Sequence, residues 1–168
     1  MIPKLQGVRE AMGLALALAI TTIALTPAAS SASLPSAQYA FNTDAGGVLL
    51  HGYDVMGYFY KNKALPGSNR FTAKWGGGTY WFSSAQYRSW FKSDPDRWVP
   101  QYGGWCAMSL TRGKKVDADP NFFVRRETGL FVFANNEQMQ AWLTDEAKHE
   151  AQAKAGWEQV QFIAPADL

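Results

Sequence analysis

The only cysteine of the chain, Cys106, lies in the segment PQYGGWCAM, which runs from Pro100 to Met108. A thiol is a soft metal ligand and, as a thiolate, a nucleophile. Gly103 and Gly104 come just before it, and residues without side chains let a ligand or another backbone segment approach closely. Free cysteine is also among the most buried residue types, where it acts as a small apolar side chain. The residue types therefore allow a ligand, a reactive group or a core residue.

A metal site at Cys106 would draw on His51 and Met108, because thiolate, imidazole and thioether together suit Cu(I) or another soft metal. If residues 106–108 are extended, both sulfurs lie on one face of the strand. If they are helical, the two side chains diverge by about 200° and cannot share an ion. The alternatives are a surface role for His51 and a core role for Met108. No C-x-x-C or H-x-x-x-H pair supports the metal site.

A redox role for Cys106 would need a base or a depressed thiol pKa, for which His51 and Arg112 are the candidates. No second cysteine could resolve a disulfide, so turnover would need an external thiol or a partner protein. The phosphate-binding pattern G-x-x-x-x-G-K-[ST] and the hydrolase pattern G-x-S-x-G are both absent. A binding module therefore fits this sequence better than an enzyme does.

The N-terminal segment, residues 1–32, has the three parts of a secretory signal peptide. Lys4 and Arg9 make a basic start, AMGLALALAITTIAL is an uncharged apolar run, and Ser30-Ser31-Ala32 supplies the small residues before a cleavage site. The apolar run is shorter than the roughly 20 residues that span a bilayer, so an uncleaved membrane anchor is the alternative. We expect export to the periplasm or the extracellular space, without stable membrane insertion after cleavage.

Cleavage after Ala32 leaves a mature chain whose length suits one compact domain. It removes Lys4, Arg9 and Glu10, so the formal net charge changes from +2 to +1. The remaining basic residues are scattered among acidic ones, so no stripe of charge indicates nucleic acid or an anionic membrane. All ten Phe, seven Trp and seven Tyr follow Ala32. With a single cysteine, this aromatic core must supply the stability.

The mature chain shows two hairpin patterns, each followed by a helix pattern. FTAKW and YWFSS flank GGGT, and NFFVRR and LFVFAN flank ETG, with Gly129 in the turn. Ser83 or Ser84 can cap a helix over AQYRSWFKSD, in which Tyr87, Trp90 and Phe91 form one apolar face. Asn135 or Asn136 can cap a last helix over residues 137–160, which Gly156 ends or weakens.

These patterns predict an α+β fold, with a small antiparallel sheet built from two hairpins and helices packed on it. We expect a flexible lead-in over residues 33–46, a domain over 47–134 and a C-terminal helix over 135–168 packed on that domain. The two hairpin–helix units indicate a faint internal repeat.

Three segments together resemble the YHS-domain proteins of the exported bacterial type: HGYDVMGYF, KWGGGTYWFSSAQYRSWFKSDPDRWVPQYGGWCA and DPNFFVRRETGLFVF. The resemblance covers about residues 47–134 in order and spacing. Val55, the pair Met56-Gly57 and Trp105 depart from the family pattern, whereas Asp54 and Cys106 match it.

The resemblance implies six family-typical positions. Asp54, Tyr58, Tyr102, Gly103 and Gly104 are the expected ligand-binding residues, and Cys106 is the expected metal ligand or redox-active residue. Related domains in metal-handling proteins imply metal binding through thiols, and relatives with selenocysteine at the position of Cys106 imply redox chemistry. For Asp54, the residue type also allows a role as a turn or helix-cap residue. We therefore expect an exported module that binds a small ligand or soft metal, with a thiol redox protein or a non-catalytic interaction domain as alternatives.

Overall fold

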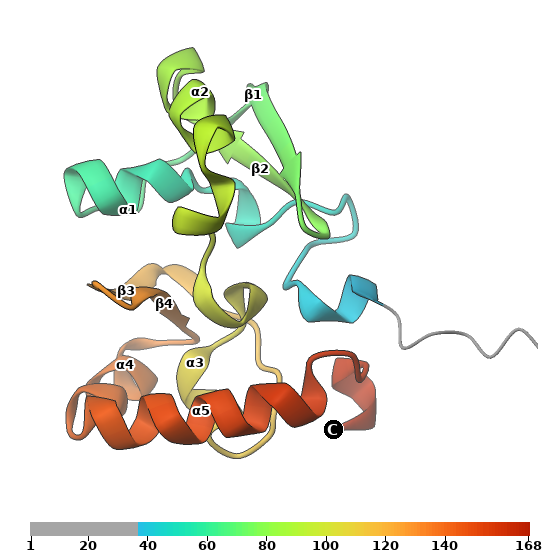
Figure 1. The fold of residues 1–168 in the computed structure, drawn as a ribbon, viewed down its shortest axis with the longest axis vertical. Coiled ribbons are helices and arrows are strands. Elements are labelled where there is room, and N and C mark those ends of the chain that lie inside the picture. The colour runs from blue at the N-terminus through green and yellow to red at the C-terminus, as the bar shows by residue number, and fades with distance from the viewer. Residues whose placement is uncertain (1–36) are drawn as a thin grey trace, which may run out of the picture. The chain divides into compact units, whose positions relative to one another are not determined.

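The computed structural model describes residues 37–168 (Figure 1), so the predicted signal peptide lies outside the described residues. Two antiparallel hairpins alternate with short helices, which confirms the predicted α+β fold with two hairpins. The strands are β1 (Ser68–Trp75), β2 (Gly78–Phe82), β3 (Asp119–Arg126) and β4 (Gly129–Phe133). The α-helices are α1 (Val55–Lys61), α2 (Ala85–Ser93), α3 (Ala107–Leu110), α4 (Asn136–Leu143) and α5 (Glu146–Val160). Five 3₁₀ turns complete the described chain: η1 (Ala37–Ala40), η2 (Leu50–Gly52), η3 (Pro95–Arg97), η4 (Gln101–Gly104) and η5 (Pro165–Asp167).

The two hairpins form separate two-stranded sheets and do not merge into one. Single bridges extend each of them: Val48 pairs with Thr79 beside β2, and Cys106 pairs with Val132 beside β4. Figure 1 shows the resulting grouping, with α1 and α2 around the first hairpin and α3, α4 and α5 around the second. The buried apolar side chains form two clusters. The second hairpin lies between them, because Leu130 and Val132 belong to the cluster of the first group, whereas Phe131 and Phe133 belong to that of the second.

The two groups are an internal structural repeat. Strands β1 and β3 have the same length, as do β2 and β4, and Ser68 is equivalent to Asp119 in a register that holds through both hairpins. Both hairpins also have a register irregularity near the start of the first strand. The caps match as well, because Ser84 accepts a hydrogen bond from the N–H of Tyr87 and Asn135 accepts one from the N–H of Gln138. The faint echo in the sequence is therefore a repeat of the whole hairpin–helix unit.

The repeat extends to the segment before each hairpin. His51 in η2 and Tyr102 in η4 are equivalent, and both have left-handed backbone angles, with φ of 50° and 54°. The second unit then has one additional glycine, after which GYDVM over residues 52–56 matches GWCAM over residues 104–108. Cys106 consequently occupies the position of Asp54, directly before the short helix of its unit.

The predicted single helix over residues 137–160 is wrong, because α4 ends at Leu143 and α5 begins at Glu146. Asp145 has a non-helical backbone and accepts a hydrogen bond from the N–H of Lys148, which makes it the cap of a new helix. Gly156 does not end α5. It lies against the carbonyl oxygen of Leu110, where any side chain would collide, so its role is close packing of α5 on α3.

The described part of the expected lead-in, residues 37–46, packs on the domain. Ala40 is buried, the backbone N–H of Asn42 donates to the carbonyl oxygen of Gly103 at 2.9 Å, and Thr43 pairs with Leu49. No helix within residues 37–168 is long and apolar enough to cross a membrane.

Lys115 joins the two ends of the described chain. It is buried, and its Nζ lies 5.7 Å from the ring of Trp105 and 5.6 Å from that of Trp157. The ammonium group donates to three carbonyl oxygens at 2.7–2.8 Å, those of Tyr39, Gln161 and Ile163. Burial lowers the pKa of Lys115 to about 8, from an ordinary value of 10.5.

Substitution Lys115→Met should change how stability depends on pH. Between pH 8 and 10.5 the unfolded wild type binds more protons at Lys115 than the folded protein does, so this residue's contribution to the free energy of unfolding rises with pH. The free energy of unfolding of the wild type minus that of K115M, measured by urea denaturation, should increase from pH 8 to 10.5 and stay constant from pH 6 to 7. A difference that is constant from pH 7 to 10.5 would contradict this assignment.

Candidate functional site

Asp54 is fully buried, and its carboxylate organises the first unit. Oδ1 accepts a hydrogen bond from the N–H of Met56 at 2.9 Å, which caps α1. Oδ2 accepts from both the N–H and the hydroxyl of Ser83, at 2.7 and 2.6 Å, at the junction of β2 and α2. Burial raises the pKa of Asp54, and these three hydrogen bonds oppose the rise. The geometry makes Asp54 a cap and a tether between elements, as the residue type alone had allowed.

Tyr58 and Tyr102 are core residues with hydrogen-bonded hydroxyls. The hydroxyl of Tyr58 donates to the carbonyl oxygen of Pro120 at 3.0 Å, and its ring packs edge-on against Phe123 at 4.7 Å. The hydroxyl of Tyr102 donates to the carbonyl oxygen of Glu150 at 3.4 Å. Burial raises the pKa of both groups, to about 12 for Tyr102. The contacts of Tyr58 tie α1 to β3, and the hydrogen bond of Tyr102 ties η4 to α5.

Gly103 and Gly104 allow a backbone segment to approach, and the approaching segment belongs to the chain itself. Both have positive φ angles, 61° and 84°, which side chains rarely tolerate. A Cβ at Gly103 would collide with the carbonyl oxygen of Ala40, and one at Gly104 would lie 3.1 Å from the side chain of Leu49. The space that sequence reasoning gave to a ligand is filled by the segment around Ala40.

Cys106 is completely buried in the second core, with Tyr102, Trp105, Phe131, Phe133 and Trp142 among the members of the cluster. Its N–H donates to the carbonyl oxygen of Val116 at 3.0 Å, but its side chain makes no capping bond to α3. Ser83, the partner of Asp54, is replaced at the equivalent position of the second unit by Ala134. An apolar pair of residues thus stands where the first unit has a polar one.

The expected soft-metal set is not brought together. His51 is exposed on η2 and bonds to Asp117, whereas Cys106 is sealed in the core and Met108 lies partly buried in helix α3. Residues 106–108 are not an extended strand, so the geometry that would place both sulfurs on one face is not formed. Among residues 37–168, no group of three His, Cys, Asp or Glu side chains could hold an ion.

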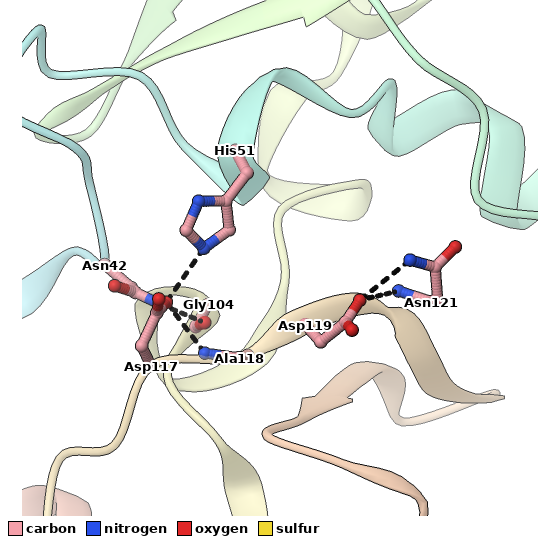
Figure 2. A network of polar contacts seen from close by, with 7 residues as sticks. All are labelled: Asn42, His51, Gly104, Asp117, Ala118, Asp119 and Asn121. Carbon is pink, nitrogen blue, oxygen red and sulfur yellow. Dashed lines mark hydrogen bonds and ion pairs between the residues drawn. The ribbon is translucent and has the colours of Figure 1, made fainter.

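His51 belongs to a polar network at the surface (Figure 2), centred on Oδ1 of Asp117. This oxygen accepts from Nδ2 of Asn42 at 2.7 Å and from the N–H of Ala118 at 2.8 Å, and it lies 2.9 Å from Nε2 of His51. Asn42 also donates to the carbonyl oxygen of Gly104 at 3.1 Å. The network joins the N-terminal segment, η2 and η4 to the start of β3. Its contacts therefore hold these four segments of the chain together.

A pocket of about 450 Å³ lies between the end of α1, η3 and the turn of the second hairpin. We call it the arginine pocket, and its lining residues are Phe59, Tyr60, Arg97, Trp98, Arg125, Arg126, Glu127 and Gly129. The guanidinium of Arg97 lies over the ring of Trp98, 4.7 Å from its centre. The indole N–H of Trp98 is buried and has no hydrogen-bond partner within the described part of the chain. Rings and cations therefore share one cavity.

The charges of the arginine pocket leave one positive charge in excess. Arg126 is paired with Glu146 through two hydrogen bonds of 2.8 and 2.9 Å, so its charge is compensated. Arg97 and Arg125 form no salt bridge with any residue from 37 to 168, and Glu127 offsets one of them. A monoanion is the ligand charge that this cavity complements.

Next to the pocket, four aromatic rings form a group that we call the aromatic shelf: Tyr60, Tyr87, Trp90 and Trp98. Tyr60 contacts the other three at centroid distances of 4.8–5.9 Å. Tyr60 is 47% exposed and Trp90 is 39% exposed. The sequence predicts that Tyr87, Trp90 and Phe91 form one apolar face of α2. Of these three, Phe91 is buried in the first core, Tyr87 packs partly buried against that core, and Trp90 is exposed.

Sequence reasoning found neither the pocket nor the shelf. Their residues come from four elements, α1, α2, η3 and the second hairpin, and no spacing in the chain links Tyr60 to Arg125. The one signal in the sequence was the aromatic content of the first unit.

Comparison with known proteins gives no family assignment. No family model, no curated protein and no solved structure matches the chain.

Substitution Asp54→Ala should lower the free energy of unfolding by roughly 3 kcal/mol or more, because it leaves the Ser83 N–H, the Ser83 hydroxyl and the Met56 N–H without their acceptor. Asn135→Ala is the matched control, since it removes an exposed cap and should cost about 1 kcal/mol. Urea denaturation of both variants measures the contrast. Equal losses would show that the buried carboxylate has no special role.

The thiol of Cys106 should resist iodoacetamide in the native protein and react fully in urea, because the reagent cannot reach a sealed side chain. Mass spectrometry before and after denaturation measures the modification. Cys106→Ala should fold, with a loss of about 1 kcal/mol for the small cavity. Stoichiometric labelling of the native protein within minutes would contradict the buried assignment.

Proposed function

We propose that the protein is an exported, non-enzymatic binding module of the YHS type, which holds a small monoanionic ligand in the arginine pocket. The observation that carries this proposal is the combination of ring faces and unpaired guanidinium groups in one cavity of about 450 Å³. Three aromatic residues stand beside four charged ones in its lining, so apolar faces are combined with polar groups that can fix the orientation of a ligand.

The aromatic residues, Arg97 and Arg125 would each contact a different part of the ligand. Phe59, Tyr60 and Trp98 offer apolar area to a ring or a short carbon skeleton. Arg97 is oriented by its stacking on Trp98, so its donors are already ordered before a ligand arrives. Arg125 is exposed and has no carboxylate partner in the described chain, so it can close on an anion from the hairpin side. A carboxylate matches the forked donors of a guanidinium.

The geometry gives less support to a role for the thiol. A sulfur sealed under aromatic rings can neither collect an ion from solvent nor attack a substrate without local unfolding. A carrier of soft metal and a thiol redox protein would both need that access, whereas the pocket is open at the surface.

Substitution Arg125→Ala should weaken the binding of D-galacturonate or benzoate by about tenfold, because a charge-assisted hydrogen bond is lost. The affinity is measured by isothermal titration calorimetry at low salt. Arg112→Ala is the matched control, because Arg112 is also exposed but follows α3, away from the pocket lining.

The neutral sugar D-galactose should bind at least tenfold more weakly than D-galacturonate, because it lacks the carboxylate. Equal affinities for these two sugars, or an unchanged affinity in R125A, would reject the arginine pocket as an anion site.

A further inference from the structure

Two rings of the aromatic shelf, Tyr87 and Trp90, have no aromatic counterpart in the second unit. The repeat provides the comparison, because α2 and α4 are equivalent helices of the two units. Phe91 corresponds to Trp142, and both are buried large rings. Tyr87 and Trp90 correspond to Gln138 and Ala141, so the second unit builds the same helix without aromatic residues at these two positions. The shelf is therefore a property of the first unit's surface.

The first unit also lacks a cover that the second unit has. Helix α5 packs on α3 and α4 of the second unit. No helix within residues 37–168 packs in this way on α1 and α2, where the shelf rings Tyr60 and Trp90 are exposed to solvent. Contiguous exposed aromatic surface is uncommon on soluble domains and marks sites of interaction.

The shelf is continuous with the arginine pocket, because Tyr60 and Trp98 belong to both. The arginines of the pocket therefore lie at one end of the combined surface and the rings of α1 and α2 at the other. The helices of the shelf also carry exposed or half-exposed cations, Lys61 at the end of α1 and Arg88 in α2. This distribution complements a ligand with one carboxylate ring in the pocket and further rings along the shelf, whose carboxylates Lys61 and Arg88 can pair.

We infer that the aromatic shelf extends the arginine pocket into a binding site for an oligosaccharide that carries a carboxylate sugar unit. The inference rests on the proposed function, since the carboxylate unit occupies the arginine pocket. The flat C–H faces of pyranose rings stack on aromatic side chains. Tyr60, Tyr87 and Trp90 pack against one another with centroids 4.8–5.7 Å apart, and Tyr60 and Trp90 are the exposed rings that a sugar can reach. The pocket excess of one positive charge matches one uronate carboxylate.

Other occupants fit the surface less well. An extended peptide needs backbone partners, and the shelf side chains of α1 and α2 stand on helices whose backbone groups bond internally. Single-stranded nucleic acid needs a cationic groove along its whole backbone, whereas the pocket arginines gather at one end here and the shelf adds only Lys61 and Arg88. A second copy would bring the same cations against each other.

The test compares D-galacturonate, tetragalacturonate and a neutral galactose tetrasaccharide by isothermal titration calorimetry on the mature protein. Tetragalacturonate should bind at least tenfold more tightly than the monosaccharide, and at least tenfold more tightly than the neutral tetrasaccharide. Trp90→Ala should weaken tetragalacturonate about tenfold and leave D-galacturonate unchanged, because Trp90 belongs to the shelf but not to the pocket. Phe162→Ala, which removes another exposed ring at the C-terminal end, should change neither affinity.

The ways in which the test can fail are distinguishable. If D-galacturonate binds through Arg125 but the tetramer binds no more tightly, or if Trp90→Ala has no effect, the shelf inference is overturned and the arginine pocket stands. If neither acid binds, both fail. Tighter binding of oligo-dT or of an acidic helical peptide than of tetragalacturonate would also overturn the inference, as would a dimer by light scattering that Trp90→Ala dissociates.

Discussion

The buried carboxylate of Asp54 is the interaction on which the first unit depends. Its Oδ1 accepts a hydrogen bond from the N–H of Met56, which has no partner within α1. Its Oδ2 accepts two hydrogen bonds from Ser83 and so fixes the corner between β2 and α2. A carboxylate in an apolar core is costly unless each oxygen is hydrogen-bonded, and here three donors converge on it. Loop, helix and hairpin are thereby held in one arrangement, and the surface of α1 and α2 is positioned as a consequence.

In the second unit, the loop, helix and hairpin are held together by other contacts. Cys106 and Ala134 stand at the positions of Asp54 and Ser83, and the polar bridge is absent there. In its place, helix α5 packs on α3 through Gly156, and Lys115 ties the segment after α5 to the N-terminal segment through three carbonyl groups. The lone thiol is explained by this exchange, because a small apolar side chain suits a core that is closed by packing. Its chemistry as a nucleophile is not needed for that role.

The two units have also diverged at their surfaces. The second unit uses α5 as a cover, whereas the first exposes the aromatic shelf beside the arginine pocket. Arg97 and Arg125 lie at the pocket end of this surface, and Lys61 and Arg88 add cations on α1 and α2. The same hairpin–helix unit is thus covered by a further helix in one copy and exposes aromatic rings in the other, and the polar network around Asp117 joins the elements between them.

By itself, the sequence determined the elements and the α+β class, because turn glycines, strand alternation and caps such as Ser84 and Asn135 act over a few residues. It also contained the helix break at Asp145, although the continuous run of helix-forming residues concealed it. Tertiary structure decided the state of Cys106, since burial depends on what packs over a residue, and GWCAM alone allows either an exposed or a sealed thiol. It also decided the meeting of Tyr60, Trp98 and Arg125, which lie far apart in the chain and come together only because the second hairpin folds against α1 and η3. Local propensity fixes which segments are strands and helices, whereas a surface site is made by long-range packing, and that packing leaves no regular spacing in the sequence.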